Sequence, residues 1–121
     1  MATVRYLVDD VSAAVDFYAG YLDFVVVQRY GPAMAILQRD DLRLWVAGPT
    51  ASAAQPMPDG RRPEPGGWNR LVLEVDDLDV TICALRDAAV PFRNEPISGP
   101  GGRQVLIDDP SGNAVELFEP A

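Results

Sequence analysis

The chain has 121 residues, of which 48% are hydrophobic and 23% charged, a composition typical of one soluble globular domain. Its net charge of −8 argues against nucleic acid, whose phosphates would be repelled, and favours neutral or cationic partners. No apolar run approaches the roughly 20 residues that span a bilayer, so no membrane partner is expected. The first ten residues lack the pattern of a signal peptide and the chain has a single cysteine, so we expect a cytoplasmic protein.

Two segments of the chain have the same order of features. Residues 3–18 (TVRYLVDDVSAAVDFY) align without a gap with residues 70–85 (RLVLEVDDLDVTICAL). Each segment is typical of a strand, an acidic pair and then a helix. The helices are predicted from apolar stripes with helical spacing, which are Val11, Ala14, Val15, Tyr18 and Leu22 in the first and Leu78, Thr81, Ile82 and Leu85 in the second.

The acidic pairs precede the two helices, where free backbone N–H groups need acceptors. Asp9 and Asp10, and likewise Asp76 and Asp77, are therefore predicted to cap the helices, with a role as ligands as the alternative. Cys83 is predicted to lie on the apolar side of the second helix and to serve in packing.

Strand-like runs follow each helix and predict the order β-α-β-β-β twice. The runs are residues 24–31, 34–40 and 42–48 in the first half, and 91–96, 103–109 and 114–120 in the second. Between the halves, residues 48–67 are rich in Pro and Gly and predict either a solvated linker or a lid over a binding site. Residues 98–103 (SGPGGR) lack the ending of a phosphate-binding loop and are predicted to form a hairpin bend.

Three stretches carry a resemblance to a known superfamily: VDDVSAAVDFYAGYLDF (8–24), VDDLDVTICALRDAAVPF (75–92) and DDPSGNAVELFEP (108–120). In these the chain resembles the vicinal oxygen chelate superfamily, also called the glyoxalase, bleomycin-resistance and extradiol-dioxygenase fold. The resemblance implies an α+β fold in which two βαβββ modules form a paired, cup-shaped mixed β-sheet. As one domain over residues 1–121, it has module 1 at about 1–47, a linker at about 48–67 and module 2 at about 68–121. Asp23 stands where the family helix usually ends in Gly, and Asp tolerates the left-handed backbone there.

Strand residues alternate between the helix side and the implied cup. Val4, Tyr6 and Val8, with Leu71, Leu73 and Val75, are predicted to be core. The predicted ligand-binding residues in the cup are Thr3, Arg5, Leu7, Arg43, Trp45, Arg70, Val72, Glu74, Glu116 and Phe118. Trp68 is predicted either at the lip of the cup, as part of a lid, or in the core.

Metal-dependent relatives take their ligands from the first and last strands of each module. The resemblance places Thr3, Arg43, Arg70 and Glu116 at those positions. One carboxylate beside two guanidinium groups repels a divalent cation, so we expect no metal and no cofactor. A buried Glu116 needs a partner, for which Arg70 and Arg43 are the candidates. The pair either only stabilises the cup floor or also contacts the ligand.

Taken together, these features favour a metal-free protein that binds a small aromatic or cationic molecule, as in antibiotic sequestration of the bleomycin-resistance type. The alternative is a metal-independent isomerase, epimerase or cyclase, with Glu116 or Glu74 as base and an Arg at the oxyanion. A regulatory module for a metabolite is a third possibility. The chain has no histidine and shows no nucleophile beside a base, which favours binding over catalysis. The resemblance also implies a homodimer.

Overall fold

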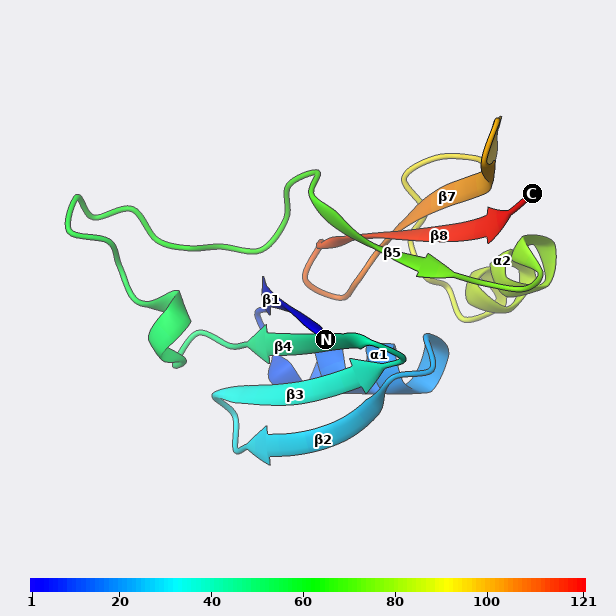
Figure 1. Cartoon of the computed structure of the whole chain (residues 1–121). Helices are drawn as coiled ribbons and strands as arrows, with labels where there is room; N and C mark the ends of the chain where they lie inside the picture. Colours follow the sequence, from blue (N-terminus) through cyan, green and yellow to red (C-terminus); the bar gives the residue numbers. More distant parts are fainter. The chain divides into compact units, whose positions relative to one another are not determined.

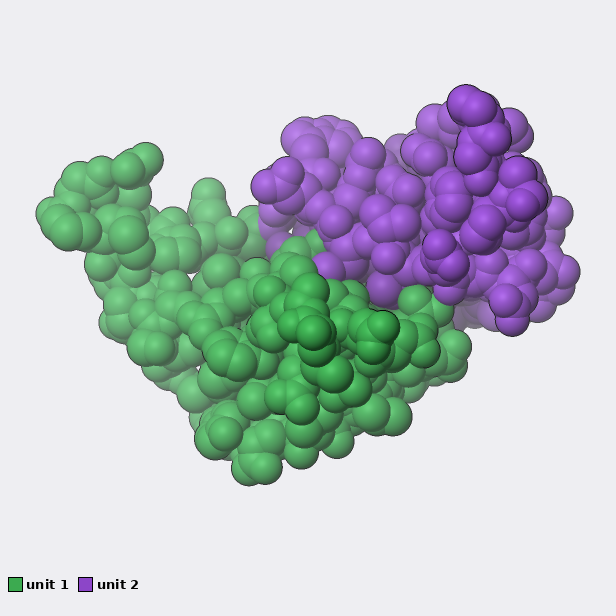
Figure 2. Space-filling model, viewed as in Figure 1, with its two compact units in different colours: residues 1–65 green, residues 66–121 purple.

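Two compact units, Met1–Pro65 and Gly66–Ala121, make up the chain in the computed structural model, which describes all of residues 1–121 (Figure 2). The elements of the first unit are β1 (Ala2–Leu7), α1 (Val11–Tyr21), β2 (Val25–Tyr30), β3 (Met34–Arg39), β4 (Leu42–Ala47) and the 3₁₀-helix η1 (Ser52–Ala54). Its sheet has the order β1-β4-β3-β2, with β1 parallel to β4 and the other pairs antiparallel (Figure 1).

The second unit repeats this plan. Its elements are β5 (Arg70–Glu74), α2 (Leu78–Asp87), β6 (Ile97–Gly99), β7 (Gly102–Asp108) and β8 (Ala114–Pro120). The sheet order β5-β8-β7-β6 matches that of the first unit, again with one parallel pair, β5 and β8 (Figure 1). The predicted α+β class with two βαβββ modules, each forming a four-stranded mixed sheet, is therefore confirmed. No helix has the length and apolar character that crossing a membrane requires.

One predicted strand is wrong. Residues 91–96 form only an isolated bridge, between Phe92 and Ile107, and the strand that pairs with β7 is Ile97–Gly99. The Gly-rich stretch 98–103 makes the tight connection between β6 and β7, as predicted for a hairpin bend.

The two helices begin at aspartates. Asp10 accepts a hydrogen bond from the backbone N–H of Ala13, and Asp77 accepts one from that of Val80, each at 3.1 Å. The caps are thus the second aspartate of each predicted pair, while Asp9 and Asp76 are not the N-cap residues. Helix α2 is also held at its start by the carboxylate of Glu119 on β8, which accepts from the N–H of Leu78 at 2.9 Å.

The apolar stripes of both helices pack against one face of their sheets. All five predicted positions of α1 are buried, as are three of the four of α2, and Thr81 is half-buried. Asp23 has φ of 60°, so it adopts the left-handed backbone predicted for it. Cys83, however, is exposed, and its predicted role in packing is wrong. The helix turn that carries Ile82 inward points its neighbour Cys83 outward.

The predicted linker, residues 48–67, lies mostly within the first unit. The N–H of Gly48 donates to the carbonyl of Ala33 at 2.8 Å, which ties the start of this segment to the turn between β2 and β3. The segment then forms η1 and a turn in which Met57 donates to Arg61 at 2.7 Å. Hydrogen bonds of its own therefore order a segment that has little apolar periodicity.

We expect Asp77→Ala to lower the free energy of unfolding by about 1 kcal/mol, because the first turn of α2 loses the acceptor for an otherwise unpaired N–H. Asp76→Ala is the matched control, since it removes the same charge one residue earlier without touching the cap. Urea denaturation of both variants measures the difference. Equal stability of the two variants would show that the cap contributes nothing beyond charge.

Candidate functional site

Each sheet has one face covered by its helix and one face without a helix, which we call the helix-free face. In the first unit, the pairing of β1 with β4 sets Thr3 beside Arg43, Arg5 beside Trp45 and Leu7 beside Ala47. The alternate residues of β3 and β4, fully buried against α1, define the opposite face: Ala35, Leu37, Leu44 and Val46. The predicted alternation of β4 is therefore confirmed, and β1 shares its faces through the register, but Val4 and Tyr6 are only half-buried rather than core, as is Val75 in the second unit.

In the second unit, the helix-free face is built on β5 and β8. Leu71 and Leu73 of β5 are buried on the helix side, and Val115 and Leu117 of β8 are fully buried with them. The residues predicted to face the cup therefore share the helix-free face: Arg70, Val72, Glu74, Glu116 and Phe118. A role of these residues in ligand binding stays a prediction.

The acid of this face is already paired. Arg70 Nε lies 3.3 Å from Glu116 Oε1, and Glu116 as a whole is only 7% exposed. The predicted pairing of Glu116 with Arg70 is confirmed. Arg43 instead donates from Nε to the side-chain oxygen of Gln38 at 3.4 Å, within the first unit. The guanidinium of Arg70 thus supplies the positive charge that a buried carboxylate requires.

The strand register corrects one predicted position. In the second unit, Glu116 lies beside Val72, two residues after Arg70 on β5. In the first unit, the residue two positions after Thr3 is Arg5, and its neighbour on β4 is Trp45. Arg43 lies beside Thr3 instead. Trp45 is therefore the counterpart of Glu116, and the four positions that the resemblance implies for metal ligands become Thr3, Trp45, Arg70 and Glu116.

This set of side chains does not fit a catalytic metal. Zinc, iron and nickel sites need several imidazole, thiolate or carboxylate donors, and only Glu116 among the four offers one. A cation at this carboxylate also has to compete with the guanidinium of Arg70. Neither unit gathers three or more Cys, Asp or Glu side chains in a geometry that could hold a metal ion.

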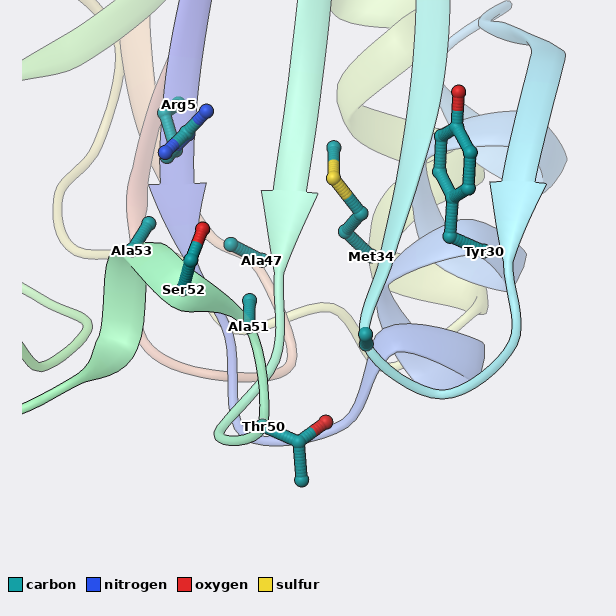
Figure 3. Close-up of a pocket in the computed structure, with 9 residues that line it drawn as sticks. Arg5, Tyr30, Met34, Ala47, Thr50, Ala51, Ser52 and Ala53 are labelled. Carbon is teal, nitrogen blue, oxygen red and sulfur yellow. The ribbon is translucent and has the colours of Figure 1, made fainter.

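A pocket of about 280 Å³ opens on the helix-free face of the first unit (Figure 3). Its walls are mostly small or apolar side chains, and η1 and the loop before it close one side: Arg5, Tyr30, Ala33, Met34, Ala47, Thr50, Ala51, Ser52 and Ala53. Arg5 also lies over the ring of Trp45, 5.0 Å from its centroid. The indole nitrogen Nε1 of Trp45 is buried and has no hydrogen-bond partner. Sequence reasoning missed η1 as a pocket wall, because its short Ala-rich run has no distinctive pattern.

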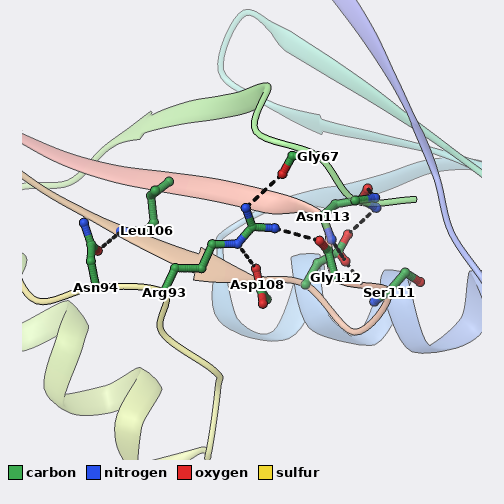
Figure 4. Close-up of polar contacts among 10 residues, drawn as sticks. Gly67, Arg93, Asn94, Leu106, Asp108, Ser111, Gly112 and Asn113 are labelled. Atoms are coloured by element: carbon green, nitrogen blue, oxygen red, sulfur yellow. Dashed lines mark hydrogen bonds and ion pairs between the residues drawn. The ribbon is translucent and has the colours of Figure 1, made fainter. Parts of the chain in front are cut away.

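Trp68 precedes β5 and is 72% exposed, so the core alternative for this residue is wrong. Its ring stacks against Arg93, whose guanidinium lies 4.8 Å from the ring centroid. Arg93 is fixed by Asp108 and by the carbonyls of Gly67 and Gly112, at 2.8 and 2.9 Å (Figure 4). The Trp68 ring therefore packs against a guanidinium that three contacts hold in place.

The turn at residues 109–113, whose Gly112 carbonyl contacts Arg93, was not predicted as functional. Asp109 is buried and accepts hydrogen bonds from the N–H groups of Ser111 and Asn113 at 2.8 and 2.9 Å. Asn113 in turn accepts from the N–H of Gly66 at 2.8 Å. The Asp-Pro-Ser-Gly-Asn run is a recognisable turn signal, but its tertiary partners are not readable from it.

The second unit also carries an ion pair on its outer surface. Arg103 donates to Asp79 at 3.1 Å, and this hydrogen bond together with the negative charge of Asp79 raises the pKa of the Arg103 guanidinium. Arg103 therefore stays charged across the physiological pH range, and its bond links β7 to α2 rather than serving the helix-free face.

The sequence profile of the Glyoxalase/Bleomycin resistance protein/Dioxygenase superfamily matches residues 1–117, and the chain belongs to this superfamily. Among solved structures it is similar to TnmS3, an antibiotic binding protein from a Streptomyces species, with 26% identity, a TM-score of 0.74, and coverage of 98% of this chain and 93% of that chain. A superfamily member from Sphaerobacter thermophilus is 25% identical, with a TM-score of 0.77 over 98% of this chain and 95% of that chain.

A lactoylglutathione lyase from Agrobacterium tumefaciens has the same fold, with a TM-score of 0.77 over 98% of this chain and 92% of that chain. At 22% identity, this likeness concerns the fold alone. No curated protein matches the chain in sequence.

We expect Arg70→Ala to lower the free energy of unfolding by about 1–3 kcal/mol, because it leaves a buried carboxylate without its partner. The double variant Arg70→Ala/Glu116→Gln should regain part of this loss, since the unpaired charge is gone. Urea denaturation at neutral pH measures both. Arg62→Ala, at an exposed arginine without an ion pair, is the control, and an equal effect of Arg62→Ala and Arg70→Ala would contradict the prediction.

Proposed function

We propose that the protein is a metal-independent binding protein that sequesters a small, partly aromatic molecule, such as an antibiotic, on its helix-free faces. The observation that carries this proposal is the ion pair at the family ligand position. Glu116 is the one carboxylate among the four positions, and Arg70 neutralises it at 3.3 Å. A face whose carboxylate is already paired with an arginine is suited to binding organic molecules through apolar contact and hydrogen bonds rather than through metal coordination.

The pocket on the first unit supports binding of a compact ligand. Its volume of about 280 Å³ is near the lower end of the range for small-molecule sites, and its walls are mostly apolar with a few polar groups. Similarity to the antibiotic binding protein TnmS3 is consistent with sequestration as the role.

Catalysis is the weaker alternative, because neither candidate base stands free beside an acceptor site. Glu116 is buried and held by Arg70. Glu74 is exposed at the end of β5 and does not line the pocket of the first unit. The ligand experiments therefore also test for a metal-independent isomerase, epimerase or cyclase, which would alter the bound compound.

A screen by thermal unfolding tests the proposal, with polycyclic aromatic antibiotics and cationic glycopeptides as probes. A ligand that binds only the folded state should raise the unfolding temperature by roughly 10 °C at about 100 times its Kd. The bound compound should be recovered unchanged by mass spectrometry, and elemental analysis should find no stoichiometric metal. Recovery of an altered product would assign an enzyme instead. A host that expresses the protein should lose sensitivity only to compounds that bind, and unchanged sensitivity would refute the resistance role.

We also propose that the homodimer implied by the resemblance forms through β2. All six residues of this edge strand are exposed, including Val25, Val26 and Val27. Antiparallel pairing of two copies with Val26 opposite itself sets Arg29 beside the partner's Asp23, an exposed carboxylate with no ion pair in its own chain. Charge complementarity and unpaired edge groups therefore favour a second copy as the occupant.

Val26→Lys should convert this dimer to a monomer, because it sets two ammonium groups against each other at the twofold axis. Val80→Lys, at an exposed valine of α2, is the matched control and should leave the dimer intact. Light scattering after size-exclusion chromatography measures the mass. A dimer that survives Val26→Lys would exclude this edge as the interface.

A further inference from the structure

The indole N–H of Trp45 is a buried donor without an acceptor. Its nitrogen Nε1 has no hydrogen-bond partner in the chain, although buried Trp N–H groups usually have one. An unpaired buried donor costs stability, so a folded chain that keeps one is unusual unless another molecule supplies the acceptor. Trp45 holds the strand position that corresponds to Glu116 in the second unit.

Arg5 is the neighbour of Trp45 across the strand pair. The two residues are Cα partners on β1 and β4, and the guanidinium lies 5.0 Å from the indole centroid. Arg5 is exposed, has no ion pair, and lines the pocket of about 280 Å³ (Figure 3). Arg5 therefore lines the pocket, and the indole of Trp45, which does not itself line it, lies next to Arg5.

No acidic side chain lines the pocket. The chain as a whole has a net charge of −8, which favours cations over its general surface, but the pocket has the opposite local charge because of Arg5. Local contacts fix the orientation of a bound molecule, whereas net charge acts mainly on the rate of encounter.

Resting on the function proposed above, we propose that Trp45 Nε1 and the Arg5 guanidinium together bind a carboxylate or carbonyl oxygen of an aromatic ligand whose ring occupies the pocket. Arg5 is the side chain that moves. Its contact with the face of the half-buried indole is weaker than a hydrogen bond between a guanidinium and a carboxylate. An incoming carboxylate can therefore draw Arg5 off the ring and reach the indole N–H.

The tyrosine and hydroxyl side chains at the rim extend this chemistry. Tyr30 lies at the end of β2, and Ser52 lies in η1 across the pocket from it (Figure 3). Tyr30 offers an aromatic face for a planar ring, and Ser52 offers a hydroxyl to a second polar group. The class of ligand is thus a flat aromatic molecule with at least one acceptor oxygen at its edge.

Proton–nitrogen correlation NMR of the indole groups tests the proposal, with 2-naphthoate as the probe and 2-naphthylmethylamine as the matched cation that cannot accept a hydrogen bond. The chain has two tryptophans, so Trp68→Phe assigns the two indole signals. We expect 2-naphthoate to move the Trp45 N–H signal downfield and to leave the Trp68 signal in place. The ammonium probe should not produce the downfield shift.

Binding of the same probe to variants measures the contribution of each donor. Trp45→Phe, which keeps a ring but removes the N–H, and Arg5→Gln should each weaken 2-naphthoate binding by about tenfold. Arg62→Gln removes a positive charge elsewhere in the same unit and should leave binding unchanged. Thermal unfolding of each variant checks the fold, and if Trp45→Phe is unfolded, Arg5→Gln and the indole signal decide.

Three results overturn the inference in distinguishable ways. If 2-naphthoate stabilises the protein while the Trp45 signal stays in place and both variants bind normally, the acceptor site is refuted but the proposed binding function stands. If 2-naphthoate does not bind while compounds of the antibiotic screen do, the ligand class is refuted. If neither the probes nor the screen yields a ligand, the proposed function fails as well.

Discussion

Each of the two sheets is covered by one helix on one face only, and this constraint shapes the rest of the chain. The covered face must be apolar throughout, and in β3, β4, β7 and β8 it holds fully buried side chains such as Leu37, Leu44, Val105 and Leu117. The other face has no helix to pack against, so its residues are free to carry charge and aromatic rings. The charged and aromatic side chains predicted to bind a ligand therefore lie on the helix-free faces, and the fold itself says little about what they bind.

On the second sheet the decisive contact is the one between Arg70 and Glu116. A carboxylate that is 7% exposed needs either a cation, a proton or several donors, and here a guanidinium from the adjacent strand meets that need. The pairing follows from the parallel register of β5 and β8, which sets the side chains of neighbouring positions on one face. Because the arginine belongs to the chain, the charge balance is present without any bound ion.

Local patterns in the sequence were sufficient for much of this architecture. The alternation of β1 and β5 correctly assigned Arg5 and Arg70 to the helix-free faces, and the spacing of apolar residues located both helices. The register of β4 was not readable, because pairing across a sheet depends on loops and on distant strands. Arg43 was therefore assigned to a position that Trp45 occupies. The strand predicted at 91–96 was wrong for a related reason. The residues that pair with β7 are Ile97–Gly99, which belong to the hairpin that follows.

Tertiary contacts account for the remaining differences. Nothing in the sequence around Trp68 distinguishes a core residue from an exposed one, and its position depends on Arg93, which lies on a different segment. Likewise the orphaned N–H of Trp45 cannot be inferred from residue order, because it depends on which acceptors the folded chain fails to bring near.

The two repeats carry opposite hydrogen-bonding groups at one pair of equivalent positions. In the second unit the position holds an acceptor, Glu116, whose donor is supplied by the neighbouring strand. In the first unit it holds a donor, Trp45, whose neighbour Arg5 is also a donor, and the chain brings no acceptor to the indole N–H. A metal site needs acceptors at both positions, whereas recognition of an oxygen atom needs donors at one of them. An indole at this position therefore offers a hydrogen-bond donor where a carboxylate offers an acceptor, although the strand register is the same in both units.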